Sequence, residues 1–456
     1  MLKRKTLKDY FRALSFPRIS AFMIGVPIFV GLAILFWCKL AHTMDLVEAY
    51  EKAKRHDPKY QAVYFEQRAL KTLPKQALAN LLPQINLSYS NMRYEFSKAP
   101  IYYLDYTSRT TSVSLTQPLL NLPSLTGYRQ EKLRANTGDY KLSDAEQDLI
   151  RRLVSAYLDV LYYREVLKAA EEEKIAVEEH LRAVKKLFAA GEATIADVND
   201  AEARYSSILY KLLEVEKLLY SAKNNLSRIV GEEVGDLLVL TEDIDFTTFD
   251  LKDLEYWVRL AKEENNIVKR SALGKDIAKL EIRRQTFEHF PKVDFVAGYT
   301  FTNTNNYLKT QETGYYIFGI QVRLNLFSGG YFTAKRAEAL ERYKQAEKEY
   351  DSVVSDVVQQ VTENYYGARS ALAQIYYGQV ALRSAEVARA STKRGYEAGI
   401  RTVIDVLNSE SEYYKAKVNL AKAKHEFLKY FINLRYFSGL LGEEDVKILN
   451  TLLTRK

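Results

Sequence analysis

The stretch that decides the fold is Tyr396–Tyr413, which reads YEAGIRTVIDVLNSESEY. A related stretch, FAAGEATIADVNDAEARY, stands 208 residues earlier at Phe188–Tyr205. The two align without a gap, and they share Gly191/Gly399, Thr194/Thr402, Asp197/Asp405, Val198/Val406, Glu202/Glu410 and Tyr205/Tyr413. The chain therefore contains this local pattern twice.

Each stretch has the chemistry of a tight turn between two helices. An Ala-Gly pair ends a helical pattern, and glycine can adopt the left-handed conformation that closes a helix. Three residues later, Thr-x-x-Asp has the spacing of a capping box, in which the hydroxyl accepts a bond from a free backbone N–H of the next helix. We expect two hairpin tips, at residues 189–194 and 397–402.

The same shift recurs far from the tips, so the whole unit is duplicated. A repeat of this kind dictates the architecture before any single motif does. Further matched positions are Leu82-Pro83 with Phe290-Pro291, Tyr157 with Tyr365, Leu46 with Leu254, and Ala53 with Ala261. The predicted repeats are 44–230 and 251–439, with a connector at 231–250 and a tail at 440–456 that packs beside it.

Composition limits the possible classes of protein. The 456 residues include nine prolines and 19 glycines, few enough for long helices, and Cys38 alone allows no internal disulfide. The net charge is +8, but residues 1–43 hold seven basic side chains against one acidic one, which is +6. The remainder is close to neutral, so we expect no nucleic-acid partner.

Residues 1–43 have the pattern of an export signal. A basic segment precedes the apolar run Ile19–Trp37, and Ala41–Thr43 resembles a cleavage site. The run has 19 residues, which is also long enough for an uncleaved inner-membrane anchor. Trp37 before Cys38 is too bulky for a lipoprotein signal, and we therefore expect no lipidation.

Four segments alternate between apolar and polar residues with the period of a strand. They lie at about 84–96, 109–120, 292–303 and 314–326. Their length and pattern fit transmembrane strands around an aqueous lumen, or a soluble sheet with one wet face. An export signal favours the former, and since four strands cannot enclose water, several chains would have to contribute to one barrel.

The helical segments make up the larger mass. Residues 45–80 read as helix, with Pro58 as a possible second start, and the second repeat also opens with a helix. Long helices are expected at 124–188 and 331–396, with return helices at 194–230 and 402–438. The long helices carry apolar seams with the spacing of a coiled coil. The seams are Leu149, Leu153, Ala156, Val160, Tyr163 and Leu167, and Val357, Val361, Asn364, Ala368, Ala371 and Ile375.

No catalytic, metal or nucleotide motif is present in the sequence. The five histidines are scattered without the spacing of metal ligands. Ser328-Gly329-Gly330 reads as a turn, because no Lys-Ser/Thr follows as a phosphate loop requires. We expect neither an enzyme nor a cofactor.

This order of strands, long helix, tip and shorter helix, repeated behind an export signal, resembles the TolC-like outer-membrane efflux and secretion channels. The resemblance covers essentially the whole mature chain. The motifs that carry it are Asp57-Pro58, Leu82-Pro83-Gln84, Gln117-Pro118-Leu119-Leu120, Leu326-Phe327-Ser328-Gly329-Gly330 and the tip Ala398–Leu407.

The resemblance implies a mainly α fold with membrane β-strands, in which each tandem-duplicated chain gives four strands and long helical hairpins. It implies a homotrimer with one twelve-stranded barrel in outer-membrane lipid and a helical barrel across the periplasm, the connector and tail lying at its equator. Such a protein is a passive exit duct, working with a periplasmic adaptor and an inner-membrane pump of the ABC or RND type.

The resemblance also assigns a gate at the periplasmic tip. Asp405 matches the first acidic position of the pore ring, whereas Asn408 replaces the second. Tyr396 and Arg401 match the ties that close the tip, and Asp197 matches their acceptor on the other hairpin. The tips themselves, with Gly191, Thr194, Gly399 and Thr402, would meet the adaptor. The alternative is that Asp197 and Asp405 only cap their helices.

A membrane-anchored periplasmic adaptor or scaffold is the alternative function. It predicts one coiled-coil hairpin, a β-rich carboxy-terminal half and an uncleaved anchor, and the duplication argues against it. The resemblance leaves the substrate open among drugs, metal ions and secreted proteins. The opening around Tyr50 and Asp57-Pro58 is more similar to the secretion-associated branch.

Overall fold

A computed structural model describes residues 44–98, 105–241, 244–249, 251–306 and 310–454. The predictions for residues 1–43 (export signal, anchor and unlipidated Cys38) lie outside the described residues. Within the described ranges, no helix combines the length and the apolar character that a bilayer span requires.

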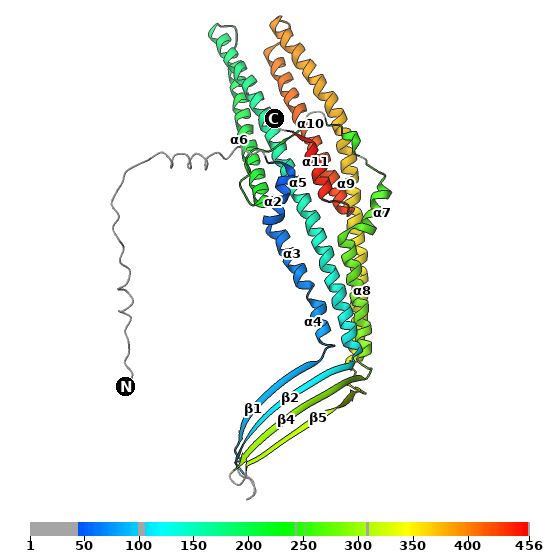
Figure 1. Ribbon diagram of the computed structural model, residues 1–456. Helices are drawn as coiled ribbons and strands as arrows, with labels where there is room; N and C mark the ends of the chain where they lie inside the picture. Colours follow the sequence, from blue (N-terminus) through cyan, green and yellow to red (C-terminus); the bar gives the residue numbers. More distant parts are fainter. Residues whose placement is uncertain (1–43, 99–104, 242–243, 250, 307–309, 455–456) are drawn as a thin grey trace, which may run out of the picture. The chain divides into compact units, whose positions relative to one another are not determined.

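The duplication is visible in the helices that open each half (Figure 1). Helix α2 (Leu46–His56) and helix α7 (Leu254–Glu264) both have 11 residues and lie 208 positions apart. The next helix starts after Asp57 in the first half and after Asn265 in the second. Both side chains cap it: Asp57 Oδ1 accepts from Tyr60 N at 2.7 Å, and Asn265 Oδ1 accepts from Ile267 N at 2.8 Å.

The two halves differ where the first one contains an extra proline. The segment expected to run as helix to residue 80 divides into α3 (Pro58–Leu70) and α4 (Leu73–Ala79), whereas α8 (Asn266–Phe287) is continuous. Pro74 stands in the first turn of α4, where its missing N–H is tolerated. The residue 208 positions later is Ile282, which can continue the helix. The predicted helix start at Pro58 is confirmed. The prediction of one continuous helix from there to residue 80 is wrong, because a new helix begins at Leu73.

One antiparallel sheet contains strands from both halves, in the order β1-β2-β4-β5. Its strands are β1 (Gln84–Tyr94), β2 (Tyr106–Leu120), β4 (Lys292–Asn306) and β5 (Thr310–Arg323). The second and fourth strands begin earlier than the expected 109 and 314. The fourth also ends at Arg323 instead of 326, because Arg323 pairs with Lys292, the first residue of β4.

The register collects apolar side chains on one face of the sheet. Leu87 lies opposite Val113, Val113 opposite Tyr299, and Tyr299 opposite Tyr316. The adjacent row, on the other face, contains hydroxyl groups: Ser88 Oγ lies 2.7 Å from Ser112 Oγ, and Ser112 lies opposite Thr300. The expected alternation is therefore present in all four strands, and it is aligned across them.

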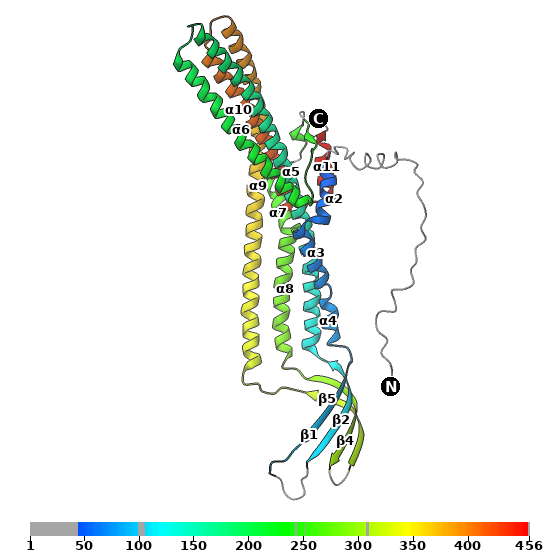
Figure 2. The same cartoon turned by 90° about the vertical axis from the view of Figure 1, so that its left-hand side faces the viewer.

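Two long helical hairpins follow the strand pairs. Helix α5 (Leu122–Ala189, 68 residues) returns as α6 (Ile195–Val230), and α9 (Tyr331–Glu397, 67 residues) returns as α10 (Val403–Phe437). At 1.5 Å per residue each long helix extends about 100 Å. Both views place the sheet at one end of α5 and the hairpin tip at the other (Figures 1 and 2).

The predicted seams face the helix contacts. In α5 the first four members are at most 1% exposed and the last two are half-buried; in α9 all six are buried, the polar Asn364 among them. Asn364 satisfies its amide by donating from Nδ2 to Gln360 O at 2.7 Å. The spacing therefore identified the packed face of both helices.

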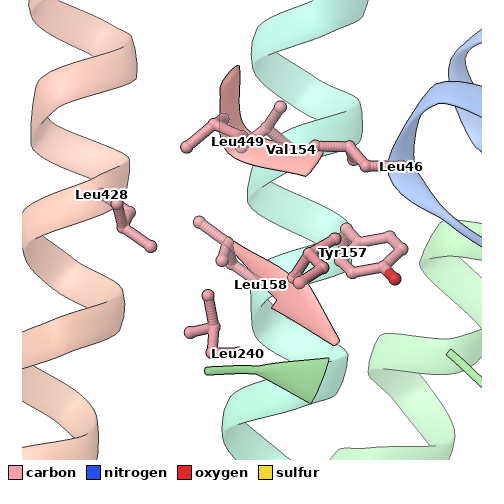
Figure 3. A pocket seen from close by; sticks show the side chains of 8 residues that line it. Leu46, Val154, Tyr157, Leu158, Leu240, Leu428 and Leu449 are labelled. Carbon is pink, nitrogen blue, oxygen red and sulfur yellow. The ribbon is translucent and has the colours of Figure 1, made fainter. Parts of the chain in front are cut away.

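The connector and the carboxy-terminal tail pack together, as expected. The connector carries β3 (Val239–Leu240) and the short helix η1 (Phe246–Thr248), and β3 pairs with β6 (Leu453–Thr454) after α11 (Glu443–Thr451). Tyr157 on α5 donates its hydroxyl to the carbonyls of Met44 and Leu238. A small cavity remains in this core (Figure 3), lined by Leu46, Val154, Tyr157, Leu158, Leu240, Leu428, Leu449 and Leu453.

A buried charge cluster ties the start of α3 to α5. Arg152 donates to both carboxylate oxygens of Asp57, at 2.9 and 3.1 Å, and through Nε to Asp148 at 2.8 Å. Arg151 and Lys59 donate to the same Asp148 carboxylate at 2.5 and 3.0 Å. Burial alone would raise the pKa of Asp148, but these hydrogen bonds outweigh burial and lower the pKa to about 2.

We predict that Asp148→Asn destabilises the protein in a pH-dependent way. A carboxyl whose pKa is depressed on folding stabilises the fold above its unfolded pKa of about 4, and this stabilisation is lost as the pH falls towards 2. The free energy of unfolding in detergent should drop by about 2 kcal/mol at pH 7 and by much less near pH 2.5. Asp351→Asn, in an exposed pair with Lys348, is the control and should change neither value. An equal loss at both pH values for Asp148→Asn would contradict the assignment.

Candidate functional site

The first tip is closed by a glycine and a complete capping box. Helix α5 ends at Ala189, and Gly191 has φ +78°, the left-handed conformation expected of it. Thr194 then caps α6: Asp197 N donates to Thr194 Oγ1 at 3.2 Å, and Thr194 N donates to Asp197 Oδ2 at 2.8 Å. Two free backbone N–H groups are thus satisfied reciprocally.

The second tip repeats this geometry. Gly399 has φ +74°, Asp405 N donates to Thr402 Oγ1 at 3.2 Å, and Thr402 N donates to Asp405 Oδ2 at 2.9 Å. The hydroxyl of Thr402 also donates to Asp405 Oδ2, at 2.9 Å. The hydrogen bond from the Thr402 backbone lowers the pKa of Asp405, and the one from Thr194 does the same for Asp197. Both carboxylates are therefore charged at neutral pH. Asp197 is exposed, and Asp405 is half-buried.

The predicted closing ties are not assembled within one chain. Among the described residues, no hydrogen bond or ion pair joins Tyr396 or Arg401 to Asp197. The Arg401 backbone N–H donates to Gly395 O at 3.1 Å, and its guanidinium contributes to the low pKa of Asp405. The role of these three residues as ties thus stays a prediction.

Asn408 joins the two hairpins of one chain. Its Oδ1 accepts a hydrogen bond from Arg204 Nη1 on α6 at 3.1 Å, while Arg204 Nε pairs with Asp200 at 3.1 Å. Next to it, Leu407 is buried against α5 and α6 in a cluster with Val177, Ile208 and Leu212. The position expected in a pore ring is therefore also a contact between hairpins.

Further from the tips, a row of charged contacts joins α5 to α10. Lys417 donates to Glu172 Oε2 at 2.5 Å, Lys429 pairs with Asp159, and His425 Nε2 lies 3.5 Å from Glu165 Oε1. Sequence reasoning missed these pairs, because the partners are about 245–270 residues apart and no local spacing brings them together.

A further contact stabilises the second hairpin near its tip. The Arg389 guanidinium lies 4.0 Å from the centre of the Tyr413 ring, and its Nη1 lies 3.5 Å from Glu410 Oε2. A cation over an aromatic face is attracted by the ring quadrupole. This contact holds α9 to α10 at the level where the predicted gate begins.

The described residues carry no cluster that could bind a metal. No group of three or more His, Cys, Asp or Glu side chains lies together in the described ranges. The arrangement offers two capped tips, an anionic carboxylate on each, and polar contacts that hold one hairpin against the other.

A comparison with family models finds one match, described as "Outer membrane efflux protein". It covers two segments, residues 49–232 and 257–440. Both ends of the second segment lie 208 residues after those of the first (257 against 49, and 440 against 232). The match thus reproduces the duplication that the sequence showed.

Curated relatives are similar over nearly their whole length. The chain is 29% identical to the Proteases secretion protein PrtF of Dickeya chrysanthemi over 423 residues, which covers 89% of this chain and 90% of that protein. It is 26% identical to the Alkaline protease secretion protein AprF of Pseudomonas aeruginosa, over 90% of this chain and 87% of that one. It is 25% identical to the Outer membrane protein TolC of Vibrio cholerae, over 93% and 97%.

Solved structures share the fold. The outer membrane protein VceC from Vibrio cholerae superposes with a TM-score of 0.73 at 16% identity, over 86% of this chain and 96% of that one. The outer membrane channel CmeC of Campylobacter jejuni gives a TM-score of 0.76 at 14% identity, over 92% of each chain.

We predict that two substitutions separate the capping role of Asp405 from a role in the gate. Thr402→Ala removes the capping hydroxyl but keeps the charge of Asp405, and it should cost about 1 kcal/mol of local helix stability. Hydrogen exchange of residues 403–406 should therefore accelerate. Asp405→Asn keeps an acceptor for the Thr402 N–H but removes the charge.

If Asp405 belongs to a gate, pore current should rise in Asp405→Asn and stay unchanged in Thr402→Ala. Thr194→Ala, which removes the capping hydroxyl of the other tip and leaves the charge of Asp197 in place, is the matched control for capping. Equal currents in Asp405→Asn and in the unmodified protein would leave Asp405 with the capping role alone.

Proposed function

Because the chain belongs to the outer membrane efflux protein family, we propose that it is a trimeric outer-membrane exit duct of a tripartite efflux or type I secretion system. The duct conducts substrates passively from an inner-membrane pump across the periplasm and the outer membrane. It is gated at the periplasmic tip of its helical hairpins.

The observation that carries this proposal is the sorting of the sheet into two faces. One face presents apolar side chains, with Leu87, Tyr316 and Phe318 each more than 60% exposed. The opposite face presents hydroxyl groups such as Ser88, Ser112 and Thr300. Apolar groups suit contact with lipid, and hydroxyl groups suit a wet lumen.

The two unpaired edges of the sheet support assembly. Among the residues that the structure describes, strands β1 and β5 each have a neighbour on one side only. A free edge in a lipid environment leaves backbone N–H and C=O groups without partners, which is costly. Three copies of the sheet would supply twelve strands and close the ring around water, which four strands cannot do.

The names of two relatives favour a role in protein secretion. PrtF and AprF are named for the secretion of proteases. A secretion duct of this kind would receive a polypeptide from an ABC-type pump, whereas an RND-type pump would deliver small molecules. The energy for either must come from the pump, since the sequence carries no nucleotide-binding motif.

The tips are the surface that we assign to the periplasmic adaptor. The two turns lie at the same end of the helices (Figure 2) and are formed by Gly191 and Thr194 on one hairpin and by Gly399 and Thr402 on the other. Tyr396 and Arg401 would then close the tip by contacts with Asp197 of a neighbouring copy, and Asp405 and Asn408 would line the constriction.

The alternative of an anchored adaptor has less support. It requires one hairpin and a β-rich carboxy-terminal half. The chain has two hairpins, and its carboxy-terminal half is dominated by α9 and α10.

We predict that Arg401→Ser raises the single-channel conductance of the purified protein in a planar bilayer several-fold. The loss of a charged hydrogen bond is repeated in each of three copies, so the closed tip is weakened at three places. Arg182→Ser is the control, because Arg182 is exposed and pairs with Glu178 within its own helix. A conductance unchanged by Arg401→Ser would contradict the gate, and the absence of any conductance from well-folded trimers would contradict the duct.

A further inference from the structure

One titratable side chain in the contact between α5 and α10 is buried without a hydrogen bond. His425 on α10 is 2% exposed. Among the described residues, neither of its ring nitrogens has a hydrogen-bond partner. A buried polar group without a partner costs free energy, so packing alone does not explain a histidine at this position.

His425 occupies the middle position of the row of charged contacts between α5 and α10. Its Nε2 lies 3.5 Å from Oε1 of Glu165 on α5. Lysine stays charged throughout the physiological pH range, whereas histidine changes its charge within that range. The middle contact of the row can therefore be switched by pH, unlike the two ion pairs on either side of it: Lys417 with Glu172, and Lys429 with Asp159.

The separation between His425 and Glu165 is slightly longer than a hydrogen bond. A hydrogen bond from a cationic nitrogen to a carboxylate is about 2.7–2.9 Å long. The Glu165 side chain is 43% exposed, so it has room to turn towards the ring. A neutral imidazole donates from only one of its two nitrogens, but an imidazolium donates from both. Protonation therefore places a charged donor at Nε2, next to the carboxylate.

We propose that His425 and Glu165 form a pH-sensitive contact between the two hairpins of one chain. When His425 is protonated, its Nε2 donates to Glu165, and the row contains three ionic contacts. When His425 is neutral, the row contains two ionic contacts with a buried neutral ring between them. Acidic conditions therefore strengthen the hold of α10 on α5.

The direction of this pH effect follows from the surroundings of the ring. A histidine that gains an anionic acceptor on folding stabilises the fold below its unfolded pKa of about 6.5, and this contribution is lost as the pH rises. Burial acts in the opposite direction, because it disfavours the charged ring. Since the Glu165 carboxylate keeps access to water, the pair does not carry the full cost of burying two charges.

On the α5 side, the other titratable group next to His425 stays neutral. The ring of Tyr162 lies edge-on to the imidazole, with 5.7 Å between the ring centres. Burial raises the pKa of the Tyr162 hydroxyl, which therefore keeps its proton between pH 5 and 8. Glu165 is thus the group on α5 that can supply a counter-charge.

The other elements packed here contribute no titratable group among their described residues. On α9, the level of His425 lies between Gly378, which meets Leu420, and Gly367, which meets Tyr430. Residues 371–374 at that level read ALAQ. On α10 itself, the nearest charges are paired, Lys422 with Glu426 and Lys429 with Asp159. The side chains that α6 and the connector add to this core are Leu219, Ala222, Phe246 and Phe249.

The contact is specific to the junction between the two halves of the chain. The equivalent of His425 in the first repeat is Lys217, which is exposed. The equivalent of Glu165 in the second repeat is Ala373. Duplication alone therefore does not account for this pair of residues.

The consequence for the duct rests on the proposed function. If the hairpin tips form the gate, a firmer hold between α5 and α10 in acid opposes the separation of the tips. The contact itself lies within one chain and does not require a pore. Hydrogen exchange can therefore measure it independently of conductance.

Hydrogen exchange of the full chain in detergent tests the contact. The unmodified protein and His425→Gln are compared at the same pH, so that the intrinsic pH dependence of exchange cancels. At about pH 5.5, segments 158–170 and 418–432 should exchange roughly fivefold faster in His425→Gln, because a partly exposed charged hydrogen bond is lost. At about pH 8, where histidine is neutral, the two proteins should exchange at nearly the same rate.

Three further variants separate the charge from the packing. Glu165→Gln keeps the buried ring and removes its counter-charge, so it should resemble His425→Gln at pH 5.5. His425→Lys gives the middle position the residue found at its two neighbours, and it should protect both segments equally at both pH values. His289→Gln, at an exposed position next to the sheet, is the control and should change neither segment.

Two results would overturn the contact and leave the duct standing. One is a loss of protection in His425→Gln that is equal at both pH values. The other is a Glu165→Gln protein that exchanges like the unmodified protein at pH 5.5, and this result decides alone if the His425 variants do not fold. Pore current that is absent while the exchange pattern is as expected would overturn the duct and leave the contact standing.

Discussion

The pairing of β2 with β4 is the constraint on which the rest of the structure depends. It joins the two halves of a duplicated chain in one antiparallel sheet, and it does so in a register that keeps Val113 and Tyr299 on one face and Ser112 and Thr300 on the other. A slip of one residue would place the apolar set of one half among the hydroxyl groups of the other. Because β2 and β4 lead directly to and from the helices around them, the same pairing fixes how the two hairpins start.

The hairpins place the tips far from the sheet whose register aligns them. Each long helix carries the chain about 100 Å from the sheet, and a glycine with a capping box turns it back without strain for a non-glycine residue. Contacts such as Lys417–Glu172 and Arg204–Asn408 hold one hairpin against the other. These contacts are polar and partly exposed, so each is weak enough to be exchanged for contacts with a partner protein. The proposed gate would need both features: helices that keep their positions, and contacts between hairpins that can break and re-form.

Much of the fold could be predicted because duplication and periodicity are local signals. The tips, the alternation of the four strands and the buried seam of α9 follow from spacing alone, as with Val361 and Ala368. The break at Leu73 was missed, although Pro74 signalled it, because a proline in the first turn is compatible with either a start or a continuation. The end of β5 depended on where β4 begins, which no pattern inside β5 contains.

The candidate site was predictable only in part, because only its short-range contacts leave a local signal in the sequence. Capping boxes at Thr194 and Thr402 are short-range and were expected. The ion pairs between α5 and α10, and the bond from Arg204 to Asn408, join residues that are distant in the chain, and spacing cannot match such partners. Tyr396 and Arg401 were assigned by resemblance to the ties that close the tip, and this role stays a prediction.

The most direct test of the account is an electron cryomicroscopy reconstruction of the purified protein in lipid nanodiscs. The account predicts three copies around one axis, a closed ring of twelve strands in the lipid disc, and a continuous lumen that narrows at the tips with Asp405 and Asn408. Separate four-stranded sheets, or helices that enclose no lumen, would contradict it.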